Sequence, residues 1–308
     1  VSNNKESEAI EFTDSLLGLM LICLFIFTVL ALAFAPIFIF FFAPGYYFDS
    51  EVRVLAVDVL RIMFPYLALM SLVAFAAGIQ NSKNYFSVPA ATPIIFNVVL
   101  ILSAVFFSRY FDVPLFALAW GVLISGILQL LIQIFPLKLI GFLPRPSLNF
   151  NNKYLKKFGL AILPAILAGG VSQLNLLVDT IYASFLIEGS PTWLYVSERV
   201  MQLPIGVVAV AIGTVLLPSL SNHYSSKNII QFKHTLLQST KLVIFVGLPC
   251  TLGLLFFGSE ILTMLFLRGA FTYEDVLMAN ESLKMFAIGI PFFMLMKVLV
   301  PCFFALER

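Results

Sequence analysis

Apolar residues dominate eight long segments of this chain, and short polar stretches separate them. The segments lie near residues 15–43, 57–79, 91–108, 113–137, 157–187, 193–218, 238–266 and 283–305. Almost all reach the roughly 20 residues that an α-helix needs to cross a bilayer. An isolated strand would leave its backbone groups without partners in lipid. The pattern therefore predicts an all-α polytopic membrane protein with about eight spanning helices.

Composition supports this class. The chain has 308 residues, of which 61% are hydrophobic and 11% charged, whereas a soluble domain carries about a quarter charged residues. Eight buried helices of a soluble protein would lack the charges to cover its surface. The formal net charge of +2 also gives no electrostatic footprint for nucleic acid.

Lysine and arginine in the connections predict the orientation. Eleven fall on the side of the N-terminus and five on the opposite side, while Arg199 and Lys297 lie within spanning segments. Basic loops stay in the cytoplasm, so the N-terminal side is expected to be cytoplasmic.

Two parts of the chain resemble two others at a nearly constant shift. The run GYYFDSEVRVLAVDVLRI from Gly45 matches GAFTYEDVLMANESLKM from Gly269, 224 residues later. Similarly, IEFTDSLLGL matches IQFKHTLLQS, with Phe12 on Phe232, 220 residues later. The repeat predicts two pseudo-symmetric lobes that run in the same direction.

The repeat also predicts how the chain is divided. Residues 1–143 form part of the first lobe, 144–156 a basic cytoplasmic linker and 157–308 part of the second lobe. A first lobe equal to the second would begin about 70 residues before Val1, since 151 less 220 is −69. We expect the chain to be an internal piece of a longer protein.

Arg199 needs compensation, because an arginine in mid-membrane costs at least ~2.5 kcal/mol. The short turn LIEGSPTW makes the fifth and sixth segments an antiparallel hairpin. Asp179 lies 11 residues before Ser190 and Arg199 lies nine after it, so both are roughly 15 Å from the turn at 1.5 Å per residue. The two side chains could face each other, either as a purely structural pair or as part of a functional site.

Polar residues around this pair recur at helical spacing. The first stripe contains Ser172, Asn175, Asp179 and Tyr182, and the second contains Tyr195, Arg199, Gln202, Gly206 and Gly213. Such stripes face protein or water instead of acyl chains, so they predict a wet cavity between the lobes. Lys297 would add a third intramembrane charge, and Glu198 would make a helix–helix hydrogen bond or a gating contact.

Prolines at positions 65, 204, 291 and 301 interrupt apolar segments, as in the moving helices of transporters or in static kinks.

Catalytic motifs for ATP binding, metalloproteolysis or serine hydrolysis are absent from the sequence. Cys23, Cys250 and Cys302 lie apart in apolar runs, and we expect them to be small buried hydrophobes. We therefore expect no enzyme and no dedicated cofactor.

The hairpin VDTIYASFLIEGSPTWLYVSERVMQLPIGVVAVAIGTVLLPSLS, from Val178 to Ser221, resembles the signature of the MurJ (MviN) lipid II flippase family. The runs FAPGY, FSVPAATPIIFNVVLI, ALAWGVLISGILQ and KVLVPCFFAL extend the similarity over nearly all of the chain. The resemblance implies fourteen helices of the multidrug/oligosaccharidyl-lipid/polysaccharide exporter class, of which this chain would hold helices three to ten, in two lobes around a central cavity.

The resemblance also implies site residues. Arg199 matches the helix-eight arginine of a cationic cavity, and Glu198 matches the acidic residue before it. Gln202 stands where many members have glutamate, and Lys297 matches a helix-ten lysine. Asp179 matches a carboxylate that binds sodium in some members, as a coupling or structural ion.

These matches predict a flippase that carries lipid II to the periplasmic leaflet of the bacterial inner membrane by alternating access. Arg199, Lys297, Gln202, Glu198 and Asn175 would contact the substrate, an undecaprenyl-pyrophosphate-linked disaccharide-peptide. Alternatives are a flippase for another polyprenyl-linked glycan, a drug or cation antiporter, and a non-transporting scaffold of the cell-wall synthesis machinery. A positive interior disfavours cationic drugs.

Overall fold

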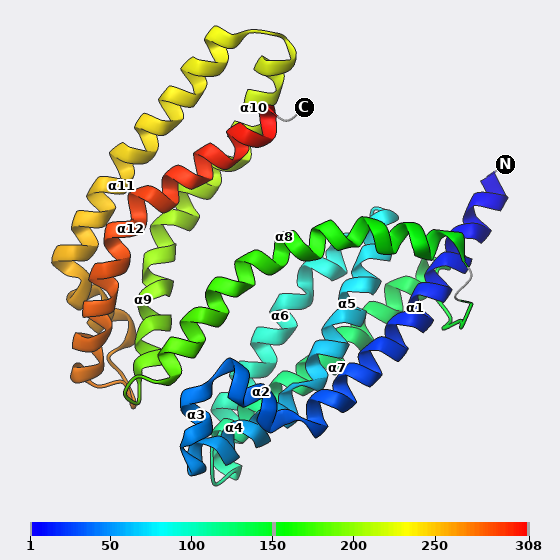
Figure 1. Cartoon of the computed structure of the whole chain (residues 1–308), viewed down its shortest axis with the longest axis horizontal. Coiled ribbons are helices and arrows are strands. Elements are labelled where there is room, and N and C mark those ends of the chain that lie inside the picture. The colour runs from blue at the N-terminus through cyan, green and yellow to red at the C-terminus, as the bar shows by residue number, and fades with distance from the viewer. Residues whose placement is uncertain (1, 150–151, 307–308) are drawn as a thin grey trace. The chain divides into compact units, whose positions relative to one another are not determined.

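The computed structural model describes residues 2–149 and 152–306, and these residues form helices and connecting loops, without strands (Figure 1). Side chains at 2–6, 165, 168, 171, 172, 175, 208–210 and 214 are not described. Contacts divide the chain into two compact units, Val1–Phe185 and Leu186–Arg308.

The first unit contains eight α-helices among its described residues. They are α1 (Ser2–Ala33), α2 (Ala35–Phe42), α3 (Pro44–Phe48), α4 (Ser50–Met63), α5 (Pro65–Ser82), α6 (Ser87–Leu102), α7 (Leu115–Leu139) and α8 (Lys153–Ser184). A π-helical turn, η1 (Ser103–Phe107), and a 3-10 turn, η2 (Ser108–Tyr110), follow α6. Helices α2, α3 and α5 each have a proline in their first turn, where its missing N–H is not needed. Pro65 therefore separates α4 from α5.

Glutamines join the three helices α5, α6 and α7. Gln80 on α5 donates its amide to the side chain of Gln133 on α7, and Gln133 donates to the hydroxyl of Thr92 on α6 over 3.3 Å. Gln129 donates to the backbone oxygen of Thr92 over 2.9 Å. All four side chains are buried. Gln129 and Gln133 are therefore interhelical hydrogen-bond partners, whereas Asn97 is exposed on α6.

Both ends of α8 contact other elements of the first unit. Near its start, Tyr154 donates its hydroxyl to Glu8 of α1 over 2.5 Å. Near its end, Ser184 accepts the backbone N–H of Gly45 of α3 over 3.0 Å. A Cβ at Gly45 would lie 1.8 Å from the Ser184 carbonyl oxygen, so this close approach requires glycine.

The connection before α8 lies along α1. Asp14 accepts the backbone N–H of Arg145 over 2.7 Å through its carboxylate, and its carbonyl oxygen accepts the N–H of Ser147 over 3.0 Å. Glu11 accepts the side-chain amide of Asn149 over 3.1 Å. The polar N-terminal stretch is thus a helical extension of α1 whose acidic side chains hold the linker.

The second unit contains four α-helices and a π-helical turn among its described residues. They are α9 (Ser190–Pro204), η3 (Ile205–Ala209), α10 (Val210–Ser225), α11 (Ile229–Phe266) and α12 (Tyr273–Leu306). In Figure 1, α12 lies beside α11 and beside the α9–α10 path, in agreement with its contacts. Leu283, Ile290 and Met294 of α12 are fully buried, so the core of this unit follows α12.

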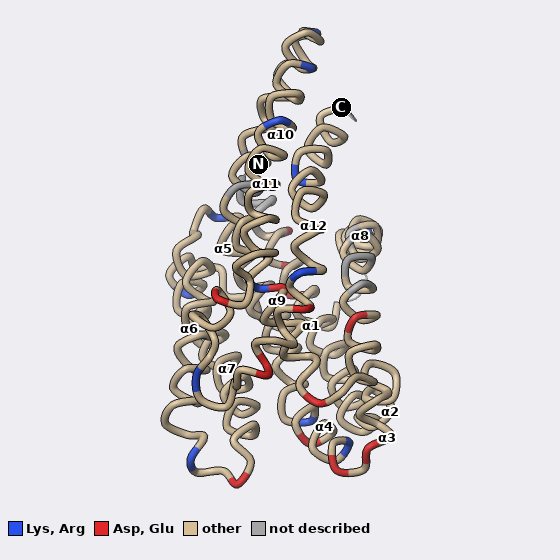
Figure 2. Tube along the Cα trace, turned by 90° about the vertical axis from the view of Figure 1, so that its left-hand side faces the viewer, with Lys and Arg blue, Asp and Glu red and all other residues tan. Residues whose placement is uncertain are grey.

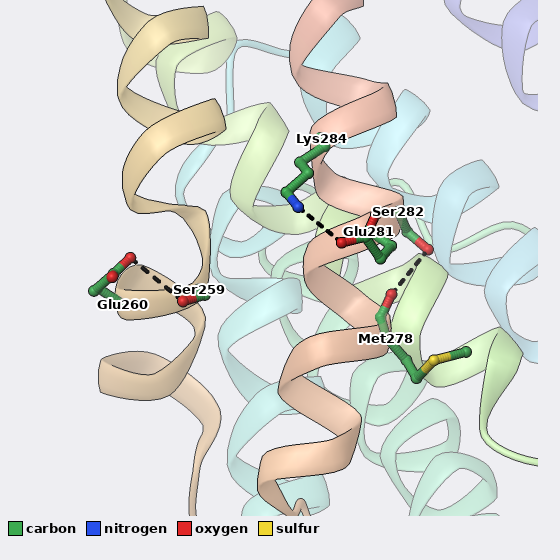
Figure 3. A network of polar contacts seen from close by, with 6 residues as sticks. All are labelled: Ser259, Glu260, Met278, Glu281, Ser282 and Lys284. Carbon is green, nitrogen blue, oxygen red and sulfur yellow. Dashed lines mark hydrogen bonds and ion pairs between the residues drawn. The ribbon is translucent and has the colours of Figure 1, made fainter.

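Helices α11 and α12 are antiparallel. Thr251 of α11 donates its hydroxyl to the backbone oxygen of Ala287 over 3.1 Å. Seven residues later, Gly258 lies against Asn280, and a Cβ there would be 2.5 Å from the Asn280 amide oxygen. Figure 3 shows the same region from nearby, where Lys284 pairs with Glu281 of α12 over 2.7 Å.

Seven helical stretches of the described residues are long and apolar enough to cross a membrane. They are Ser7–Ala33, Ser50–Ser82, Ser87–Tyr110, Leu115–Leu139, Ser190–Ser225, Ile229–Phe266 and Tyr273–Leu306. These correspond to seven of the eight predicted segments, and the remaining one, 157–187, coincides with α8. Long stretches of helix carry no charge in Figure 2. The predicted all-α polytopic fold is confirmed.

Two further sequence predictions concern the lobe boundaries and the cysteines. The contacts divide the chain after Phe185, and α8 contacts α1, α2 and α3, whereas the repeat assigned residues 157–308 to one lobe. The lobe boundaries from the repeat stay a prediction. Cys23 is exposed, not buried, because its side of a spanning helix can face lipid as a small apolar residue. Cys250 is half-buried and Cys302 is buried.

Candidate functional site

Arg199 lies in a polar cluster on one face of α9. Its guanidinium carbon lies 4.8 Å from the centre of the Tyr195 ring, one turn earlier. Its Nη1 donates to the amide oxygen of Gln202 over 3.3 Å. Gln202 in turn donates its amide N–H to Glu198 over 2.7 Å. Four side chains within two helical turns therefore form one connected group.

The opposite face of α9 explains why these residues face outward. Val196, Ser197, Val200 and Met201 are buried, at the spacing of one helical face. Ser197 donates its hydroxyl to the backbone oxygen of Ala279 on α12 over 2.6 Å. Packing on this side orients the polar cluster away from the core of the unit.

Glu198 sets the direction of the Gln202 amide. Because the amide nitrogen donates to the carboxylate, the amide oxygen faces the guanidinium of Arg199. The bond between Gln202 and Glu198 lies within α9, and the helix–helix hydrogen bond or gating contact predicted for Glu198 stays a prediction. The two ion pairs in the described part of the chain, Asp58–Arg61 and Glu281–Lys284, do not include Arg199.

Arg199 is exposed in its unit. Arginine has five N–H donors in a planar fork that matches phosphate oxygens. The bond to Gln202 uses one donor, so the others can bind an anion. The arrangement suits recognition of a phosphate or pyrophosphate group.

Lys297 lies at a different level of the second unit. A Cβ at Gly213 of α10 would lie 3.1 Å from the backbone oxygen of Lys297, so these residues are at one level. Gly213 follows Arg199 by 14 residues along α9, η3 and α10, which corresponds to about 21 Å at 1.5 Å per residue. Lys297 is exposed. The two predicted cations therefore lie at different levels of the second unit.

The predicted pairing of Asp179 with Arg199 joins residues of the two units, and it stays a prediction. Asp179 is exposed on α8, and the side chain of Asn175 lies outside the described part. Within the described residues, acidic, histidine and cysteine side chains form no group of three that could hold a metal ion. The role of Asp179 as a sodium ligand stays a prediction.

Sequence reasoning included Tyr195 in a polar stripe and gave it no role of its own. The structure shows its ring against the guanidinium of Arg199. An aromatic residue four positions before an arginine on a helix is the signal that could have predicted this contact.

The first unit has a cavity of about 910 Å³ between α1, α5 and the start of α8. Its lining is mostly apolar and includes Phe12, Leu16, Phe75 and Phe158, with Lys83 among the few polar residues. None of the predicted substrate-binding residues lines it.

Among the described residues, seven helical stretches able to span a bilayer and an arginine inside one of them define a multi-pass membrane protein with a candidate anion site. A model of the family described as lipid II flippase MurJ matches residues 1–308. The chain belongs to this family.

Curated relatives of this chain carry the same family name. A probable lipid II flippase MurJ of Buchnera aphidicola subsp. Acyrthosiphon pisum is 37% identical over 311 residues, which cover 100% of this chain and 60% of the relative. The lipid II flippase MurJ of Burkholderia cenocepacia is 33% identical, with 95% of this chain and 57% of the relative covered. The chain thus spans about 60% of the first of these relatives.

A solved structure has a similar fold. It is described as lipid II flippase MurJ in an inward closed conformation, and it superposes with a TM-score of 0.84 at 26% sequence identity. The match covers 98% of this chain and 62% of that structure's chain. The all-α fold expected from the sequence is the fold of this flippase.

Proposed function

We propose that this chain is part of a flippase that moves lipid II from the cytoplasmic to the extracytoplasmic leaflet. Family membership over the whole chain supports the class of transporter. The observation that carries the proposal is the position of Arg199 in a spanning helix. Its guanidinium contacts Tyr195 and Gln202, and its other N–H donors can bind an anion.

The substrate chemistry fits this site. Lipid II joins a sugar-peptide head to a polyprenyl tail through a pyrophosphate, and the head has to cross the apolar core of the bilayer. Charge-assisted hydrogen bonds from a guanidinium compensate part of the cost of desolvating the pyrophosphate. Arg199 binds the pyrophosphate while the tail stays in lipid.

Lys297 contacts the anion at another stage. Arg199 and the level of Lys297 are separated by about 21 Å along the helices, so the second unit has cations at two levels. In an alternating-access cycle the pyrophosphate meets them in sequence. Glu198 and Gln202 keep Arg199 in place, and Asn175 and Asp179 of α8 contribute polar groups to the path.

The protein acts in the bacterial inner membrane with the N-terminal side of this chain in the cytoplasm. The excess of basic residues in the connections on that side supports this orientation. A sodium ion is a candidate coupling ion, with Asp179 as one ligand. Lipid II is the substrate, and the cell-wall synthesis machinery is the candidate protein partner.

The test uses the full-length parent protein in cells depleted of their own lipid II flippase. The amount of lipid II accessible at the outer face is measured with an impermeant probe. Restored exposure that is lost in Arg199→Ala and kept in the control Thr192→Ala, at an exposed position of the same helix, supports the proposal. A well-expressed, membrane-inserted protein that restores nothing would contradict it and favour another polyprenyl-linked glycan.

Accessibility separates transport from a scaffold role. A single cysteine placed at Gln202 should react with a membrane-impermeant thiol reagent from water, in a variant whose native cysteines are replaced. Protection of that cysteine from both sides would indicate a packed core and contradict a water-filled path.

A further inference from the structure

We propose that Tyr195 is a positioning residue for Arg199: its ring holds the guanidinium in place and leaves the N–H donors free for the pyrophosphate. This inference rests on the proposed function, because it assigns a role at the same site.

The geometry of the pair supports this role. The guanidinium carbon of Arg199 lies 4.8 Å from the centre of the Tyr195 ring, within the roughly 6 Å range of a cation–π contact. Helical side chains lean toward the N-terminus, so the ring one turn earlier lies beside the path of the arginine side chain. The contact follows from the helix itself.

A ring holds a guanidinium differently from a carboxylate. A carboxylate would accept one or two N–H groups and cancel the charge, and it would then compete with a phosphate. A ring face attracts the cation and accepts no conventional hydrogen bond. On the other side of Arg199, the amide oxygen of Gln202 takes one donor. Tyr195 and Gln202 therefore restrict the guanidinium and preserve its charge.

The position of the pair within the chain distinguishes it from similar contacts. The cations of four other cation–ring pairs in the described residues, Arg53, Lys83, Arg109 and Lys153, lie at or near helix ends. Arg199 is the tenth residue of the stretch Ser190–Ser225, which is long and apolar enough to span the bilayer. An arginine that binds an anion there needs a partner that positions the guanidinium and leaves its charge available to the anion.

The experiment measures binding of a water-soluble short-chain lipid II analogue to the full-length protein in detergent. Tyr195→Leu removes the ring, and Tyr195→Phe keeps it without the hydroxyl. Tyr273→Leu is the matched control, because Tyr273 is 57% exposed and Tyr195 is 56% exposed. Each variant is also made together with Arg199→Ala.

We expect Tyr195→Leu to weaken binding roughly two- to fivefold, the range given by an exposed cation–π contact. Tyr195→Phe and Tyr273→Leu should bind like the parent. In the Arg199→Ala background, Tyr195→Leu should cause no further loss, because the ring acts through the arginine. A merely structural tyrosine would cause the same loss in both backgrounds.

The outcomes separate the two proposals. Parent-like binding by Tyr195→Leu, together with weak binding by Arg199→Ala, would overturn the positioning role alone. An additional loss in the Arg199→Ala background would also overturn it. Parent-like binding by Arg199→Ala would overturn the proposed function of the site. If Tyr195→Leu does not fold, Tyr195→Met is the second ring-free variant for the same comparison.

Discussion

Trp193 donates its indole N–H to the carboxylate of Asp275 over 2.7 Å, and this bond sets the register of α9 against α12. Ser197 and Ala279 are bonded four residues further along each helix. In each pair the two bonded residues are 82 positions apart in the sequence, so α9 and α12 run parallel. The polar face with Arg199 is oriented by this register.

Loss of the Asp275 carboxylate should destabilise the second unit more than loss of the indole N–H. Asp275 also accepts the backbone N–H and the hydroxyl of Thr272, over 2.7 and 2.8 Å. Asp275→Ala should therefore lower the thermal midpoint of the full-length protein more than Trp193→Phe does. Glu274→Ala is the control and should have little effect. Equal midpoints for Asp275→Ala and Glu274→Ala would show that this cluster does not contribute to stability.

A side chain at Gly45 should weaken the contact between α3 and the end of α8. A Cβ there would lie 1.8 Å from the carbonyl oxygen of Ser184, so the backbones must separate. We expect Gly45→Ala to destabilise the protein by about 1–3 kcal/mol, as overpacking does. Gly78→Ala is the control, because nothing lies within 4 Å of a Cβ at Gly78. Denaturation in mixed micelles measures both, and a stable Gly45→Ala variant would contradict the close approach.

The glutamines of the first unit should be coupled energetically. Gln80 and Gln133 are buried and hydrogen-bonded to each other, and an apolar replacement of one leaves the other with fewer partners. In a double-mutant cycle with leucine at both positions, we expect a coupling energy of about 0.6–1.7 kcal/mol, as between polar residues of other membrane helices. Additive effects in unfolding measurements would show that the bond contributes nothing.

The linker should detach from α1 when Asp14 loses its carboxylate. Asp14→Ala removes the acceptor of the Arg145 backbone N–H, which is bonded at 2.7 Å. The amide of Arg145 should then exchange its hydrogen faster, because the local structure opens more easily. Hydrogen-exchange mass spectrometry of the peptide 143–149 measures this change. Asp112→Ala, in the loop before α7, should leave the exchange rate as in the parent.

The spanning helices and the adjacent charged residues Glu198 and Arg199 were predictable from the sequence, because both depend on local patterns. Spanning helices follow from the length of apolar runs, since lipid requires every backbone group to be bonded within the helix. The pair of Glu198 and Arg199 was recognisable because charged residues are costly at that depth. Family membership confirmed what the signature hairpin had indicated.

The arrangement around these residues required the tertiary structure. Helical spacing placed Tyr195, Arg199 and Gln202 on one face, but the direction of the Gln202 amide depends on its bond to Glu198. The level of Lys297 depends on how α10 packs against α12 at Gly213. Counting residues along one segment does not show which residue of another segment lies beside it.

The class of the molecule, its spanning segments and the charged residues within them thus follow from the sequence alone, because the bilayer acts on each segment separately. The tertiary structure was needed to show how the linker lies on α1 and that Lys297 lies at the level of Gly213. These features arise from packing between segments that are distant along the chain, and there a shift of one helical turn changes every partner.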